Sequence, residues 1–128
     1  MESDSISETP LVLVVDDDPD AREAMAELLQ IQGFAVLAAG NGHEALELMK
    51  VENPRVVLLD LMMPVLSGWE FLRRRKAQPE LARIPVIVTS AVIDRAVGAQ
   101  ADGADAVLRK PIDIEKLMKL VRRLSIKT

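Results

Sequence analysis

The sequence has no cysteine and no tyrosine, and its only aromatic side chains are those of Trp69, Phe34 and Phe71. Without cysteine, neither a disulfide nor a thiolate metal site can form, and a reducing compartment fits this composition. Because aromatic residues are scarce, the core has to be built from Val, Leu, Ile, Ala and Met. With 49% hydrophobic and 28% charged residues, the composition is that of a globular protein.

The sequence also lacks an excess of positive charge and a long apolar run. Sixteen Lys and Arg against twenty Asp and Glu give a net charge of −4, which argues against a general nucleic-acid surface. No apolar run approaches the length of a membrane span, so membrane insertion is not expected. The first residues are acidic and polar, whereas a secretory signal is basic and then apolar. These features predict a cytoplasmic protein with protein partners and a disordered leader over residues 1–9.

Residues 10–126 are long enough for one domain with a closed core, and no separate output domain is expected. Short aliphatic runs alternate with longer amphipathic segments, which is typical of an α/β protein with parallel strands joined by crossover helices. The expected strands are 11–15, 34–38, 55–59, 84–89 and 104–108. The first, third and fourth are almost continuously apolar, which predicts that helices cover both faces of the sheet.

Helices are expected between these strands and after the last one. The first begins at Pro19 and ends before Gly33, the next three cover 42–51, 68–76 and 93–101, and Asp113 is expected to cap the last. The predicted buried stripe of the first helix consists of Ala24, Leu28, Leu29 and Ile31. That of the last helix consists of Ile114, Leu117, Leu120, Val121 and Leu124.

The unusual polar residues all follow a predicted strand. Asp16 and Asp17 follow the first strand, Asp60 the third, Ser90 the fourth and Lys110 the fifth. In an open parallel sheet, the carboxyl ends of the strands converge on a crevice where ligands bind. Four separate segments are therefore expected to deliver their polar side chains to one pocket.

Three carboxylates in one crevice repel one another, and their ionised forms need a compensating cation. Oxygen ligands without His or Cys favour Mg²⁺, or Mn²⁺, over zinc, and magnesium commonly binds a phosphate oxygen as well. Asp60 is the candidate nucleophile toward phosphorus, Asp16 and Asp17 the candidate metal ligands, and Lys110 and Ser90 the candidate phosphoryl contacts.

Four stretches, VVDDDP, LLDLMMPVLSG, PVIVTSA and GADAVLRKP, carry a resemblance that covers nearly the whole chain. In this order and at these intervals, they resemble the receiver domain of two-component response regulators. The resemblance implies a flavodoxin-like, doubly wound sheet of five parallel strands in the order 2-1-3-4-5. It also implies phosphoryl transfer from a histidine kinase, a phosphotransfer protein or a small acyl phosphate to Asp60.

The resemblance assigns roles to further positions. Asp17, Asp60 and the Met62 carbonyl would ligate Mg²⁺, with help from Asp16, while Ser90 and Lys110 would contact the phosphoryl group. A cis peptide bond is implied between Lys110 and Pro111. The output would be a change in affinity for a downstream protein, whose identity the sequence leaves open.

Two departures from the family pattern bear on signalling. Val107 stands where the family has the aromatic residue of its switch, and the stretch from Ser90 to Lys110 is about two residues shorter than in chemotaxis regulators. Met62 and Val92 occupy the positions that influence access of the hydrolytic water, and neither side chain can polarise a water molecule. Slow self-dephosphorylation is therefore predicted.

Simpler interpretations apply to several polar residues. Asp18 precedes Pro19 and is expected to cap a helix, and His43 is expected to be exposed. The basic run at 73–76 is interpreted as a solvated helix face that an acidic partner could use.

Other functions remain open at this stage. A phosphatase of the haloacid dehalogenase type also combines an Asp nucleophile, Mg²⁺, a hydroxyl and a Lys, but it has a second acid where this chain has Met62. A flavin-binding module would need a phosphate loop and aromatic residues, and a pseudo-receiver would not retain all five polar residues of the pocket.

Overall fold

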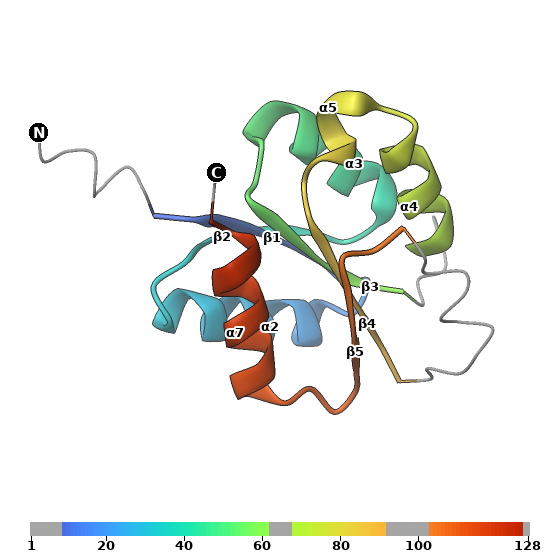
Figure 1. Ribbon diagram of the computed structural model, residues 1–128. Coiled ribbons are helices and arrows are strands. Elements are labelled where there is room, and N and C mark those ends of the chain that lie inside the picture. Colours follow the sequence, from blue (N-terminus) through green and yellow to red (C-terminus); the bar gives the residue numbers. More distant parts are fainter. Residues whose placement is uncertain (1–8, 62–67, 92–102, 127–128) are drawn as a thin grey trace, which may run out of the picture.

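The computed structural model describes residues 9–61, 68–91 and 103–126, and it forms one five-stranded sheet flanked by helices (Figure 1). All strands pair in parallel in the order β2-β1-β3-β4-β5, which confirms the doubly wound, flavodoxin-like fold predicted above. The strands are β1 Leu11–Val15, β2 Ala35–Ala39, β3 Val56–Asp60, β4 Val86–Ser90 and β5 Ala106–Arg109. The helices are α2 Pro19–Ile31, α3 Gly42–Glu52, α4 Gly68–Lys76, α5 Pro79–Ala82 and α7 Ile114–Leu124.

The sheet separates two hydrophobic cores, because successive side chains of a strand point to opposite faces. In β1, Leu13 and Val15 face the core under α3, α4 and α5, whereas Val12 and Val14 face the core under α2 and α7. Figure 1 shows these two groups of helices on opposite faces of the sheet. Strands buried on both sides explain why β1, β3 and β4 are almost entirely aliphatic.

Side-chain caps begin three of the helices. Asp18 accepts a hydrogen bond from the Asp20 amide, Asn41 accepts one from Glu44, and Asp113 accepts from Glu115 and Lys116. Each cap provides a partner for amide groups that have no carbonyl partner in the first helical turn. The predicted capping roles of Asp18 and Asp113 are therefore confirmed.

Some boundaries and helix faces differ from the sequence prediction. The last four strands begin one or two residues later than expected, and the short helix α5 was not anticipated. Ile31 is 79% exposed and Ala24 is also exposed, so the buried stripe of α2 is narrower than predicted, with Leu29 fully buried. Ile31 lies about seven residues, or two turns, after Ala24, so both side chains are on one face of α2, and this face points away from the core that buries Leu29. The helix predicted at 93–101 lies outside the described residues.

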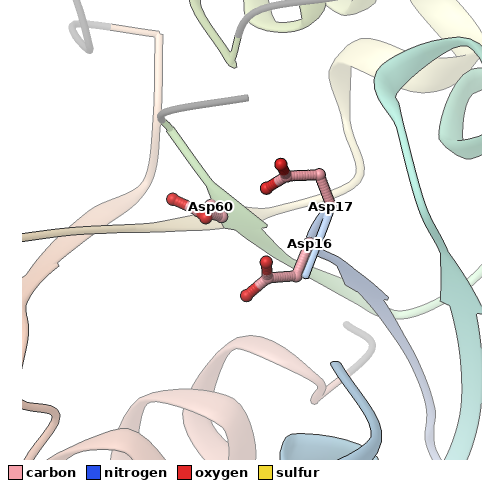
Figure 2. Close-up of side chains that lie close together, drawn as sticks. All are labelled: Asp16, Asp17 and Asp60. Carbon is pink, nitrogen blue, oxygen red and sulfur yellow. The ribbon is translucent and has the colours of Figure 1, made fainter. Parts of the chain in front are cut away.

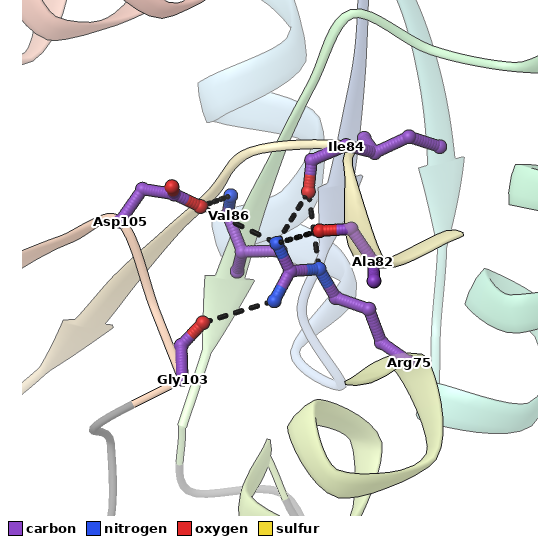
Figure 3. A network of polar contacts seen from close by, with 6 residues as sticks. All are labelled: Arg75, Ala82, Ile84, Val86, Gly103 and Asp105. Carbon is purple, nitrogen blue, oxygen red and sulfur yellow. Dashed lines mark hydrogen bonds and ion pairs between the residues drawn. The ribbon is translucent and has the colours of Figure 1, made fainter. Parts of the chain in front are cut away.

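The interpretation of 73–76 as a solvated face is wrong for Arg75, which is only 4% exposed. Its guanidinium donates hydrogen bonds to the carbonyl oxygens of Ala82, Ile84 and Gly103 (Figure 3). It also lies 3.4 Å from a carboxylate oxygen of Asp105, which in turn accepts from the Val86 amide at 2.8 Å. Burial lowers the pKa of Arg75 below its ordinary value, and the Asp105 carboxylate opposes that shift. Arg75 therefore joins α4 to the segments that lead into β4 and β5.

Candidate metal and phosphoryl-acceptor site

Asp16, Asp17 and Asp60 come together at the carboxyl end of the central strands (Figure 2). β1 and β3 are neighbours, with Val15 paired to Leu59, so the residues that follow each pair share one edge of the sheet. One carboxylate oxygen from each of the three aspartates lies within 4.8 Å of the others. The structure therefore brings together the polar residues that follow the first and third strands, as two of the four segments in the predicted convergence.

Local hydrogen bonds fix the turn that carries the first two acids. The Asp16 amide donates to the Ala39 carbonyl at 3.1 Å, and the Asp18 amide donates to Oδ1 of Asp16 at 3.0 Å. Arg22, on the first turns of α2, donates to the Asp16 carbonyl oxygen at 2.8 Å. The backbone of Asp16 is thus held from two sides while its second carboxylate oxygen stays available. No sequence pattern marks the contact of Arg22 with Asp16, which only the folded chain brings about.

Asp60 is the last residue of β3 and is only 9% exposed. Lys110 places its Nζ 3.6 Å from Oδ2 of Asp60, and the peptide bond to Pro111 is cis, as the resemblance implied. The Lys110 amide donates to the Ser90 carbonyl at 2.9 Å, which fixes the lysine backbone against the end of β4. The lysine charge therefore faces the most buried of the three acids.

Two hydroxyl residues end β4, and both are buried. Ser90, the predicted phosphoryl contact, is fully buried, and Thr89 is 4% exposed. Thr89 pairs with Asp60 across the sheet and lines the same cavity as Asp60 and Lys110. The Thr89 hydroxyl donates to the Leu59 carbonyl at 3.5 Å. The Thr89 hydroxyl, which lies near Asp60 at the end of β4, therefore already has a backbone carbonyl as its hydrogen-bond partner.

The donor set fits a hard divalent cation. The three clustered ligands are all carboxylates, and none of the described residues adds a histidine or cysteine to the group. Carboxylate oxygens at this spacing suit Mg²⁺ or Mn²⁺, and three negative charges so close together favour a bound cation. Met62, whose carbonyl is the fourth predicted ligand, and Val92 lie outside the described residues.

Comparison with known proteins agrees with the observed fold. A family model described as the response regulator receiver domain matches residues 12–122. The response regulator MprA of Mycolicibacterium vanbaalenii is 39% identical over 116 residues, covering 88% of this chain and 49% of that protein. This chain therefore spans about half the length of that relative.

Two solved structures show the same architecture. The chemotaxis protein CheY4 of Vibrio cholerae has a TM-score of 0.84 and 29% identity, covering 91% of this chain and 98% of that chain. The response regulator TrrA of Thermotoga maritima, solved in complex with Mg²⁺ and BeF, has a TM-score of 0.81 and 30% identity, covering 90% and 98%.

This chain belongs to the response regulator receiver domain family. It is therefore a signalling domain of a class that is generally not enzymatic, and Mg²⁺ binding and aspartate phosphorylation are typical of the family. Among residues 9–61, 68–91 and 103–126, every helix is too short or too polar to cross a bilayer.

Proposed function

We propose that the protein is a response regulator receiver that accepts a phosphoryl group on Asp60 from a histidine kinase or phosphotransfer protein. Phosphorylation then changes its affinity for a downstream protein. The observation that carries the proposal is the cluster of Asp16, Asp17 and Asp60, with Lys110 3.6 Å from Asp60. The proposed receiver domain covers residues 10–126, after a leader of residues 1–9, and acts in the cytoplasm without binding nucleic acid directly.

In this proposal Asp60 is the nucleophile. A carboxylate oxygen attacks phosphorus in line with the leaving group, and an aspartyl phosphate forms. The burial of Asp60 restricts the orientation of that oxygen. The adjacent Lys110 keeps a positive charge where negative charge develops on the phosphoryl oxygens.

Asp16, Asp17 and Asp60, together with the Met62 carbonyl, would hold Mg²⁺ or Mn²⁺. When bound, the cation supplies charge neutralisation for the phosphoryl oxygens. The complex of the related TrrA with Mg²⁺ and BeF supports this assignment. The fixed backbone of Asp16 would keep its free carboxylate oxygen aimed at the cluster.

Ser90 would contact the phosphoryl group after a movement of the segment at the end of β4, because its side chain is fully buried in the present structure. Val107, 37% exposed on β5, has no ring and cannot follow that movement as an aromatic switch residue would. Phosphorylation would therefore act by shifting the relative populations of the conformations of the segments around Ser90 and Lys110.

The test is an intact-protein mass measurement after incubation with acetyl phosphate, with and without Mg²⁺. We expect one phosphoryl group per chain in the presence of Mg²⁺, none with Asp60→Asn and much less in EDTA. Continuous turnover of small phosphoesters without a stable label would instead indicate the haloacid-dehalogenase-type phosphatase. Absence of any label on Asp60 from acyl phosphates and from a panel of purified histidine kinases would refute the proposal.

The downstream partner is sought by affinity capture with phosphorylated and unphosphorylated protein. We expect the phosphorylated and unphosphorylated proteins to retain different amounts of this partner. With Asp60→Asn, the amount retained should not change when a phosphodonor is added.

A further inference from the structure

A cavity of about 350 Å³ opens beside Asp60, between α2 and the segment that joins β5 to α7. Its polar lining includes Asp60, the proposed phosphoryl acceptor, and Lys110, whose ammonium group lies beside it. Most of the remaining lining is apolar and includes Ala21, Met25, Pro111, Ile112 and Ile114. The cavity therefore joins a charged phosphoryl site directly to an apolar compartment.

We propose that this compartment holds the acyl chain of a small acyl phosphate, so that among such donors the protein prefers propionyl and butyryl phosphate to acetyl phosphate. The inference rests on the proposed role of Asp60 and adds a selectivity for the donor.

The shape and chemistry of the cavity favour this class of ligand. Its volume lies near the lower end of small-molecule sites, about 300 to 1,000 Å³, and such sites combine apolar walls with a few polar groups. A phosphoryl head carries negative charge that complements Lys110, and a short alkyl tail complements Met25 and Ile112. A sugar phosphate would place hydroxyl groups against the apolar wall without hydrogen-bond partners, which is unfavourable.

Exposed apolar surface at the rim supports the same occupant. Ile114 is 42% exposed although it lines the cavity, so part of its surface would leave water when an alkyl chain binds. Met25 on the facing helix has an unbranched, adaptable side chain that can follow chains of different length.

The transfer step is chemically complete. An Asp60 carboxylate oxygen forms a bond to phosphorus while the bond from phosphorus to the carboxyl oxygen of the donor breaks. The bonding electron pair leaves with the carboxylate, so the step needs no proton, oxidant or other reactant. Lys110, 3.6 Å from Asp60, places positive charge beside the attacking oxygen, where it stabilises the phosphoryl oxygens, and the carboxylate departs on the opposite side of phosphorus.

The experiment compares labelling rates with acetyl, propionyl and butyryl phosphate at subsaturating concentration in Mg²⁺, followed by intact-protein mass. The leaving carboxylates have nearly equal basicity, so the intrinsic reactivity of the three donors is matched. Phosphoramidate, which has no acyl chain, is the reference donor. Each buried methylene contributes about a fourfold gain, so the two additional methylenes of butyryl phosphate should make it label about fifteenfold faster than acetyl phosphate.

Two variants on α2 form a matched pair. Ala21→Leu fills the cavity and should bring the ratio of butyryl to acetyl rates close to one. Ala24→Leu makes the same change at an exposed position of the same helix and should keep the wild-type ratio. Met25→Ala enlarges the compartment and should move the preference toward longer chains, which tests the inference even if Ala21→Leu does not fold.

Equal rates for all three acyl phosphates, with normal labelling by phosphoramidate, would overturn the inference and leave the proposed function intact. A chain-length preference that survives Ala21→Leu and is unmoved by Met25→Ala would also overturn it. Failure of every donor to label Asp60 would remove the inference together with the function on which it rests.

Discussion

The Nζ atom of Lys110 lies 3.6 Å from Oδ2 of Asp60, on the side chain that the proposed mechanism uses as nucleophile. One ammonium group cannot neutralise three clustered carboxylates, so the site retains an excess of negative charge that attracts a divalent cation. Lys110 and that cation would then compete electrostatically in the resting protein and act together once a phosphoryl group is present. This dual effect makes the lysine an informative position to change.

Lys110→Met is expected to raise Mg²⁺ affinity and slow phosphorylation at once. Loss of a partly exposed positive charge near the cluster should tighten Mg²⁺ binding by roughly three- to tenfold. The rate of labelling by acetyl phosphate should fall about a hundredfold, because the developing charge loses a stabilising partner. Calorimetric Mg²⁺ titration and mass-detected labelling measure the two effects. Lys119→Met, an exposed lysine on α7, should change neither; weaker Mg²⁺ binding in Lys110→Met would contradict the electrostatic argument.

Asp17→Asn should lower Mg²⁺ affinity by roughly tenfold or more, since even residues that only support metal ligands typically contribute 10- to 100-fold. The change removes one of the three clustered carboxylates while keeping the size of the side chain. Asp20→Asn, two positions into α2 and exposed, is the matched control and should bind Mg²⁺ as the unaltered protein does. Indistinguishable affinities in the two variants would exclude Asp17 as a ligand.

Ser90→Ala and Thr89→Ala should separate the two hydroxyl groups at the end of β4. We expect Ser90→Ala to accept a phosphoryl group but to lose the phosphorylation-dependent change in amide hydrogen exchange in the segments that contain Ser90 and Lys110. Thr89→Ala should retain that change, because the Thr89 hydroxyl is engaged by the Leu59 carbonyl. If only Thr89→Ala abolishes the response, Thr89 and not Ser90 is the phosphoryl contact.

Arg75→Ala should destabilise the fold by about 2–4 kcal/mol, because it leaves buried carbonyl groups and the Asp105 carboxylate without their partner. Arg75→Lys should recover little of this loss, since an ammonium cannot reproduce the planar fork of hydrogen bonds. Urea denaturation measures both. The neighbouring Arg73→Ala removes only an exposed pair with Glu70 and should change stability by less than about 1 kcal/mol. Equal effects at both positions would contradict the structural role of Arg75.

The phosphorylated protein should keep its label for minutes or longer in Mg²⁺ without a phosphatase. Neither Met62 nor Val92 can orient or polarise the attacking water. The measurement follows the phosphoryl group by intact-protein mass after removal of the donor. A matched pair of variants, Met62→Asn and Met62→Leu, tests the cause: the amide should shorten the lifetime, and the isosteric apolar residue should not. Loss of the label within seconds from the unaltered protein would disprove this prediction.

Much of the fold was accessible from the sequence because its signals are local. Continuous aliphatic runs in β1, β3 and β4 predict strands covered on both faces, and Asp18-Pro19 and Asp113 mark helix starts by cap chemistry. Errors arose where a long-range contact decides the outcome. Ile31 follows the helical spacing of α2, yet it lies on the same helix face as the exposed Ala24, and the packing of α2 through Leu29 turns that face to solvent.

The sequence by itself determined the candidate residues for the chemistry, because three aspartates, a serine and a lysine at predicted strand ends are marked by short-range patterns. Only the tertiary structure decided their distances: the carboxylate oxygens within 4.8 Å and the lysine at 3.6 Å depend on the pairing of β1 with β3 and on the path from β5 into α7. Arg75 shows the same limit, since it is indistinguishable from Arg73 and Arg74 in the sequence. Its burial depends on carbonyl groups from distant segments that only the folded chain brings to it.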